Sequence, residues 1–194
     1  AVGATAGSAN TTGATNTFVG SGAGAANTTA SDLVAVGHNA LTANTTGANN
    51  VAVGKGAGDA CTTGNHLVAV GYQALSAVTT GQFSIGIGKD AGLLITTGDN
   101  NVLVGYHSGD AITTGANNTA LGSYTLGDMT TVSAITAVGY SAGAAHTSGT
   151  GCVYVGAYTG DANTTGGLNT FIGDAAGGAN TTGGSNTFVG QATG

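Results

Sequence analysis

Lysine and tyrosine side chains recur at one place in this chain, directly after a glycine, where they could recognise a ligand. The series advances by seventeen residues, with two members displaced by one residue: His38, Lys55, Tyr72, Lys89, Tyr106, Tyr124, Tyr140 and Tyr158. Both lysines and five of the six tyrosines belong to it. Ammonium groups stack on aromatic faces, and tyrosine rings with polar neighbours suit contact with sugar rings. The series is a candidate glycan-contact ridge; the plainer alternative is a solvated edge where large polar residues fit.

Other reactive side chains do not converge in the sequence. Three aspartates, Asp59, Asp110 and Asp161, share one repeat position but lie three repeats apart, or ~14 Å at the spacing of stacked strands. The four histidines fall at four different repeat positions: His38, His66, His107 and His146. A zinc site or an activated nucleophile needs several groups close together. We therefore expect no enzyme, no metal site and no cofactor.

The element that positions all these residues is a repeat of seventeen. An aliphatic residue followed by glycine recurs without a slip, and its glycines are Gly3, Gly20, Gly37, Gly54, Gly71, Gly88, Gly105, Gly122, Gly139, Gly156, Gly173 and Gly190. A Thr-Thr pair follows each full repeat's glycine by eight positions, varied only at Thr147-Ser148. Such a short, strict period is typical of one unit stacked on itself. We predict an all-β, parallel β-solenoid (β-roll or β-helix) with one 17-residue coil per repeat. Residues 1–194 would form a single repeat domain of eleven full coils and a partial twelfth, and we expect this domain to be a segment of a longer fibre.

Composition narrows the alternatives. Charged residues make up 5% of the chain, 38 residues are glycine and there is no proline. Valine, isoleucine and threonine in register argue against disorder, and glycine does not fall at every third position as in collagen. The formal net charge of −6 includes no basic cluster, so we expect no nucleic-acid partner. No apolar run approaches the ~18 residues of a membrane span, and we expect no membrane insertion.

The residues around Val51 and Val53 predict a strand. Both sites hold only Val, Ile, Leu or Thr in every repeat, and we expect them to form the interior. The alternating sites would then face outward, and they are too apolar for a free surface. We therefore predict that copies of the chain associate as a homo-oligomer, either a trimer or an extended filament. The residues of the predicted chain–chain interface are Phe18, Leu33, Leu67, Leu103, Ile135, Tyr154, Phe171 and Phe188.

The asparagines and the two cysteines allow further predictions. Asparagines in Asn-x-Thr sequons are candidate glycosylation sites, the alternative being a structural asparagine ladder. The candidates are Asn10, Asn27, Asn44, Asn163 and Asn180, which each begin a sequon, and Asn118, the middle residue of the sequon Asn117-Asn118-Thr119. The cysteines, Cys61 and Cys152, lie five coils apart, over ~20 Å at the stacking distance, too far for a disulfide.

Segments 69–81 (AVGYQALSAVTTG), 43–54 (ANTTGANNVAVG) and 186–190 (NTFVG) carry a resemblance that extends over the whole chain. They look like the seventeen-residue repeats of phage tail fibres and bacterial surface proteins, which are similar to head domains of trimeric autotransporter adhesins. The resemblance implies a parallel homotrimer, an extracellular location on a virion tail or cell surface, and a role in spacing or presenting a receptor-binding tip. The function we expect is a structural fibre segment, with a cell-surface glycan as a further partner.

Two other functions remain open at this stage. An ice-binding or glycan-binding solenoid is the alternative, because regular threonine ladders could order water. Against ice binding, adjacent threonines would present only one hydroxyl per coil outward. A solenoid lyase would require a cleft of clustered carboxylates or basic residues, and the sequence contains none.

Overall fold

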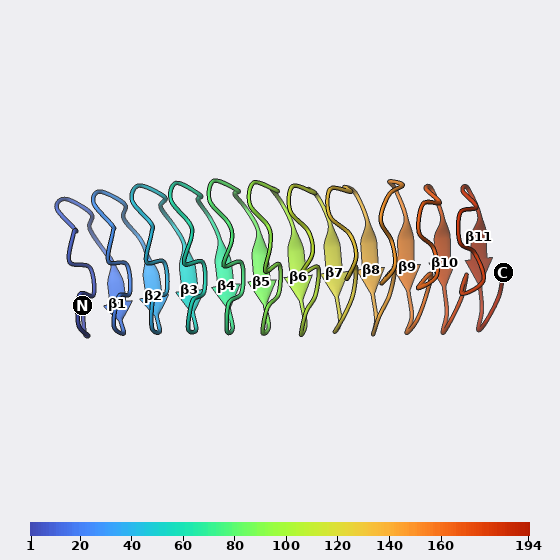
Figure 1. Ribbon diagram of the computed structural model, residues 1–194, viewed down its shortest axis with the longest axis horizontal. Coiled ribbons are helices and arrows are strands. Elements are labelled where there is room, and N and C mark those ends of the chain that lie inside the picture. Colours follow the sequence, from blue (N-terminus) through green and yellow to red (C-terminus); the bar gives the residue numbers. More distant parts are fainter.

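A computed structural model describes all residues 1–194 as a rod of stacked coils, with the two ends of the chain at opposite ends of the rod (Figure 1). Each coil contributes one strand of three residues, and the chain contains no helix. The strands are β1 (Thr17–Val19), β2 (Val34–Val36), β3 (Val51–Val53), β4 (Val68–Val70), β5 (Ile85–Ile87), β6 (Val102–Val104), β7 (Thr119–Leu121), β8 (Thr136–Val138), β9 (Val153–Val155), β10 (Thr170–Ile172) and β11 (Thr187–Val189).

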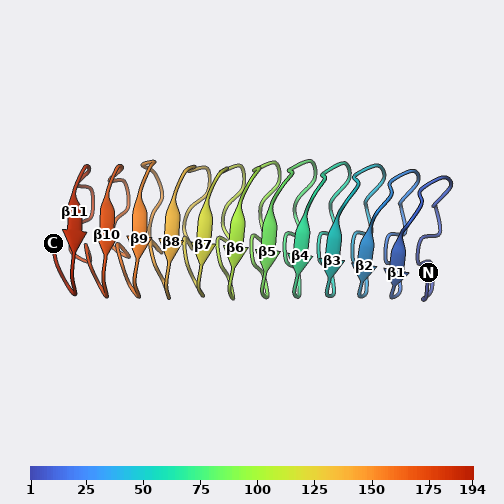
Figure 2. The ribbon, with the colours of Figure 1, turned by 180° about the vertical axis from the view of Figure 1, so that it is seen from behind.

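The strands form one parallel sheet in chain order, each paired with the strand seventeen residues later, as in Val51↔Val68. The prediction of a parallel β-solenoid with one 17-residue coil is confirmed. Only one wall of the coil is sheet, and turns make up the rest (Figure 2). Of 122 backbone hydrogen bonds, 20 lie within the strands and the other 102 involve at least one residue of a turn or loop. The turns therefore hold the stack together as well as the sheet does.

The glycine after each strand is required by the backbone. At Gly88 φ is +131°, a region that side chains rarely adopt. A Cβ built there would lie 2.4 Å from the carbonyl oxygen of Gly105, the equivalent residue of the next coil. The chain therefore turns out of the strand only where glycine lets successive coils approach this closely, which explains the unbroken period.

The strand faces are the reverse of those predicted from the sequence. In β3 the middle residue, Ala52, is fully buried, whereas Val51 is half-buried and Val53 is 37% exposed. The same alternation holds in every strand, although the middle residue of β11 is only half-buried. The prediction that the Val51 and Val53 sites form the interior is wrong; they form the outer face of the sheet.

The predicted chain–chain interface is wrong for the same reason. Its members lie in the core of the single chain, fully or almost fully buried except for the half-buried Phe188: Phe18, Leu33, Leu67, Leu103, Ile135, Tyr154, Phe171 and Phe188. Their apolar character reflects burial within the coil. A partner cannot contact them without opening the solenoid.

Two interior positions share the space inside each coil. The first is the middle strand residue, and the second lies six residues later. Where the first is large the second is glycine, as in the pairs Phe18–Gly24, Leu103–Gly109 and Tyr154–Gly160. A Cβ added at Gly24 would lie 2.3 Å from the Phe18 ring. The ring or branched side chain thus occupies the volume that the glycine leaves.

Where the middle residue is small, a leucine at the second position fills two coils. Leu75, for example, fills its own coil beside Ala69 and extends into the next coil, which holds only Gly86 and Gly92 at the two positions. Added Cβ atoms at those glycines would both lie 2.7 Å from Leu75. Leu41 and Leu126 each precede a similarly small coil. The variable composition of these positions therefore conserves total volume, as close packing demands.

Buried asparagines complete the interior. The side-chain amide of Asn118 donates to the carbonyl of Val132 at 3.0 Å, and its oxygen accepts from the Ile135 amide at 3.0 Å. Asn50 bridges Gly64 and Leu67 in the same way. These residues satisfy backbone groups that the turns leave unpaired inside the coil. They join consecutive coils and carry no exposed polar group.

Candidate functional site

The ridge predicted from lysine and tyrosine spacing is a continuous row of contacts along the rod. The Lys89 ammonium lies 5.8 Å from the ring centroid of Tyr72 and 5.1 Å from that of Tyr106, and Lys55 lies 5.7 Å from Tyr72. These distances fall within the ~6 Å range of cation–π attraction. The N-terminal half of the ridge therefore alternates cation and ring.

The C-terminal half of the ridge consists of aromatic rings alone. Tyr106, Tyr124, Tyr140 and Tyr158 meet edge to face in succession, with centroid separations of 5.2, 5.8 and 5.3 Å. Their side chains are 40–48% exposed. The geometry is the one that aromatic quadrupoles favour, and it leaves each ring partly open to solvent.

The ridge stays filled although its repeat position is not always aromatic. At two coils this position holds only Ser123 and Ala157, and the next residue supplies the ring instead, Tyr124 and Tyr158. Both tyrosines adopt positive φ, 60° and 54°, as do the other residues that follow the ridge position. The turn geometry therefore presents two adjacent positions to the same edge.

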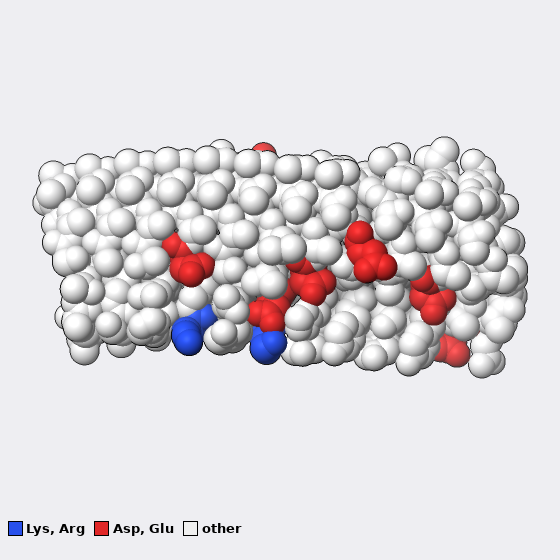
Figure 3. Space-filling view, viewed as in Figure 1, with Lys and Arg blue, Asp and Glu red and all other residues white.

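A group of charged residues borders the middle of the ridge. Asp90, which is almost fully buried, accepts a hydrogen bond from Lys89 through Oδ2, and His107 Nε2 lies 3.4 Å from the same oxygen. The other ring nitrogen of His107 lies 2.6 Å from Asp110. The hydrogen bond to Asp90 raises the pKa of the Lys89 ammonium. On the face shown in Figure 3, most of the visible acidic side chains lie in a band along the rod, with the two lysines beside that band.

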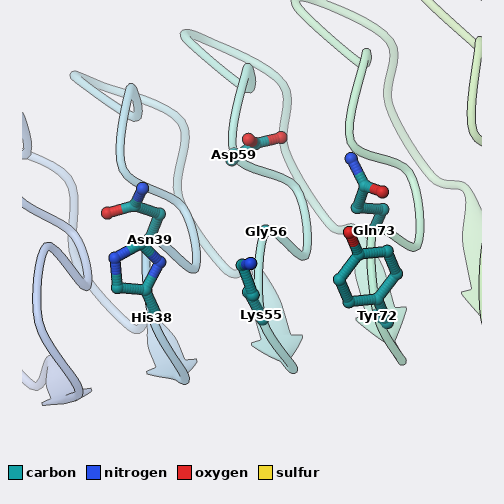
Figure 4. A pocket seen from close by; sticks show the side chains of 7 residues that line it. All are labelled: His38, Asn39, Lys55, Gly56, Asp59, Tyr72 and Gln73. Carbon is teal, nitrogen blue, oxygen red and sulfur yellow. The ribbon is translucent and has the colours of Figure 1, made fainter.

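A hollow of about 190 Å³ lies beside the N-terminal half of the ridge. Three successive coils line it through His38, Asn39, Lys55, Gly56, Asp59, Tyr72 and Gln73 (Figure 4). Burial raises the pKa of the Asp59 carboxyl. His38, Lys55 and Tyr72 were predicted for the ridge from the sequence, whereas Asn39, Asp59 and Gln73 were not. Asn39 and Gln73 directly follow ridge residues, and Asp59 lies four residues after Lys55 in the same coil.

Four of the six candidate glycosylation sites are unsuitable in the folded chain. Asn27, Asn44, Asn118 and Asn163 are fully buried, and their side-chain nitrogens donate to neighbouring oxygens. The prediction of glycans at these four is wrong, because an attached sugar would have to occupy the core. Asn10 is exposed and Asn180 is half-buried.

Some sequons instead form the asparagine ladder that was the alternative interpretation. Asn27 donates to the side-chain oxygen of Asn10 at 2.8 Å, and Asn44 donates to Asn27 at 3.4 Å. The first threonine of each Thr-Thr pair joins coils too, as when Thr45 Oγ1 donates to the Thr62 carbonyl at 3.0 Å. The second threonine, such as Thr46, is exposed.

The outer face of the sheet is a second surface of uniform character. Two residues of each strand lie on it, in rows that we call the outer rows: Thr17, Val34, Val51, Val68, Ile85, Val102, Thr119, Thr136, Val153, Thr170 and Thr187, and Val19, Val36, Val53, Val70, Ile87, Val104, Leu121, Val138, Val155, Ile172 and Val189. None is charged, and all are half-buried or exposed. The face is a long uncharged strip of aliphatic side chains and five threonines with regular spacing.

The remaining histidine, cysteine and aspartate side chains form no metal site. No three His, Cys, Asp or Glu side chains are grouped as a metal site would require. Cys61 and Cys152 are buried free thiols. With no helix in the chain, none is available that could cross a membrane.

The chain matches no protein-family model, and it shows no significant similarity to any curated protein or solved structure in the comparisons. The indications of function are therefore the fold, the ridge and the outer rows.

Proposed function

We propose that this chain is a segment of an extracellular fibre in which copies of the solenoid associate through the outer rows. Its task is mechanical: stacked coils space or present a receptor-binding tip. The observation that carries the proposal is the uncharged outer face of the sheet, which is aliphatic apart from five threonines and runs from β1 to β11. Long exposed apolar strips of this kind mark interaction surfaces.

The exposure of the outer rows is substantial. Val53, Leu121 and Ile172 are 37%, 37% and 40% exposed although none of them belongs to an edge strand. Their aliphatic side chains gain about 25 cal/mol for each Å² that a partner removes from water. The charged residues of the chain lie elsewhere on the coil, so association of this face requires no charge to be desolvated.

The partner that fits best is another copy of the same chain. Each row repeats once per coil, at the ~4.8 Å spacing of neighbouring strands. A second copy has rows of the same spacing, so side chains can interdigitate along the whole length. A partner with a different repeat would lose register after a few coils.

The resemblance of the repeats to tail-fibre and surface-adhesin repeats supports three copies around a parallel axis, and a location on a virion tail or cell surface. Neither an enzymatic activity nor a cofactor belongs to this proposal. Its partners are other copies of the chain, with a receptor carried by the tip.

The test is the native mass, measured by light scattering on the intact chain and on two lysine variants. One chain weighs 18.1 kDa, and we expect a particle of three chains. Val104→Lys places a charge in the outer rows and should yield single, folded chains. Thr97→Lys, on the exposed threonine row, adds the same charge elsewhere and should leave the mass unchanged. A wild-type particle of one chain, or equal effects of both variants, would overturn the proposal.

Ice binding is a second candidate because it would use the same face. The objection that adjacent threonines present only one hydroxyl per coil outward concerns the Thr-Thr pairs. The sheet presents two regularly spaced rows, which are β-branched apart from Leu121 and include five threonines. Thermal hysteresis separates the candidates. Activity from single chains, abolished by Val104→Lys, would favour ice binding over the fibre.

A further inference from the structure

The hollow on the ridge exists because one residue lacks a side chain. Gly56 occupies a repeat position that holds Asn39 in the preceding coil and Gln73 in the following one. The space above it is open: a Cβ added there would meet nothing closer than Gln73 at 3.5 Å and Asp59 at 3.7 Å. Tyr72 and Lys55 form the side toward the ridge (Figure 4).

The polar groups around this space are available to a ligand. In Figure 4 the amides of Asn39 and Gln73 stand on either side of the Asp59 carboxylate, over Gly56. All ion pairs of the chain lie further along the ridge, among Lys89, Asp90, His107 and Asp110. Lys55 and Asp59 belong to none of them. The hollow thus combines a carboxylate, two amides, an ammonium group and the imidazole of His38 with one tyrosine ring.

This combination selects the chemistry of the ligand. Asp59 disfavours anions such as phosphate, and Lys55 disfavours cations, so a neutral molecule is preferred. A single carboxylate is too few for a divalent cation, which takes several oxygen ligands. Hydroxyl groups can donate to Asp59 and accept from the amides and Lys55. An apolar C–H face can rest on the Tyr72 ring.

The size of the hollow narrows the choice further. Its 190 Å³ lies below the roughly 300 Å³ at which ordinary small-molecule pockets begin. One sugar ring fits this space, and its neighbours in a glycan would continue over the exposed tyrosines of the ridge. We propose that the hollow at Gly56 binds one neutral pyranose unit of a glycan. This inference does not depend on the fibre role.

The experiment measures saturation-transfer NMR and Kd on the intact chain with the methyl glycosides of glucose, galactose, mannose and N-acetylglucosamine. Glucuronic acid serves as the acidic contrast. Gly56→Asn fills the hollow with the side chain that the preceding coil already has at this position. Asparagine tolerates the positive φ of 66° found there. The matched control is Ser141→Asn, at the same repeat position but four coils beyond the last coil of the hollow.

We expect at least one neutral glycoside to bind, and Gly56→Asn to weaken it by about tenfold or more, or ~1.4 kcal/mol. Ser141→Asn should bind as the wild type does. Asp59→Asn, an isosteric change, should also weaken binding and serves if Gly56→Asn does not fold. Binding of glucuronic acid alone, binding of no glycoside, or unchanged affinity in folded Gly56→Asn would overturn the proposal. The native mass of the same samples reports separately on the fibre role.

Discussion

The inner and outer sides of the sheet differ in a way opposite to the usual expectation. Outside, the residues are nearly uniform: Val, Ile, Leu or Thr in every coil. Inside, the middle strand residue ranges from Gly86 through Leu103 to Tyr154. The outer residues are uniform because they lie on a flat, regular sheet surface. The inner residues vary because a large side chain at one interior position is balanced by a small one at its neighbour. In a solenoid, a variable position can therefore be core and a constant one can be surface.

The largest expected loss of stability comes from adding a methyl group where the backbones of two coils meet. Gly88→Ala should cost at least about 3 kcal/mol, because both the positive φ and the 2.4 Å approach to Gly105 become unfavourable. Gly127→Ala is the control: nothing lies within 3.8 Å of its added Cβ and its φ is not positive. Urea unfolding should show little change or slight stabilisation for the control. Equal losses in both variants would contradict the packing described.

Volume exchange in the core can be tested by a double-mutant cycle at Leu75 and Gly86. Leu75→Ala leaves a cavity across two coils and should cost about 3 kcal/mol. Gly86→Leu alone should destabilise by overpacking, since an added Cβ would already lie 2.7 Å from Leu75.

The double variant places one leucine in the shared space, as in β6 with Leu103 and Gly109. It should be more stable than the sum of the single effects by about 2 kcal/mol. Additive effects in urea unfolding would mean that the two positions do not share volume.

A smaller effect concerns His146, the one histidine fully inside the coil. It lies within hydrogen-bond distance of the Gly149 carbonyl, 2.7 Å, and the Tyr154 hydroxyl, 3.2 Å. Burial lowers the pKa of its imidazole, so the unfolded chain binds the proton more tightly. Stability is then full above the unfolded pKa of about 6.5 and falls by up to ~1.4 kcal/mol per pH unit below it.

His146→Asn places the residue of Asn27, Asn44 and Asn163 at the same repeat position. Comparing urea unfolding at pH 7.5 and 5.5, we expect the wild type to lose about 1 kcal/mol more than this variant. Equal losses would show that His146 does not bind its proton differently in the two states.

The smallest effect is one of reactivity rather than stability. Burial raises the pKa of the Cys61 thiol to about 11, so little thiolate forms at neutral pH and reagents cannot reach it. The folded chain should not react with a maleimide at pH 7.5, whereas Thr97→Cys should react rapidly at its exposed site. Rapid labelling of Cys61 without unfolding would contradict its place in the core.

The repeat, the strand position and the ridge could be predicted from the sequence, because stacking in register turns equal repeat positions into rows. Which strand residues face the core could not be predicted from composition alone. The valine and isoleucine residues at the repeat positions of Val51 and Val53 are as typical of a core as of a flat sheet surface. One signal was present: a large middle residue always has glycine six residues later, as Phe18 has Gly24. That pairing identifies the interior, but only when positions are compared across a turn.

The hollow at Gly56 could not be predicted by aligning equal repeat positions either. Asp59 approaches the ridge by way of a turn that has positive φ at Gly54, Gly56 and Gly58. Nothing in the repeat pattern places that carboxylate beside Tyr72. A glycine between two amides along one row was visible in the sequence, and it is the feature that opens the space.

The most direct measurement of the central claim is carbene footprinting of the native particle, with the outer rows compared to the ridge. If copies associate through the sheet, the strand peptides around Val102 and Val104 are protected in the wild type and become labelled in Val104→Lys. Tyr72 and Tyr106 on the ridge should be labelled alike in both. Strong labelling of the outer rows in the wild type, equal to that of the variant, would contradict the account.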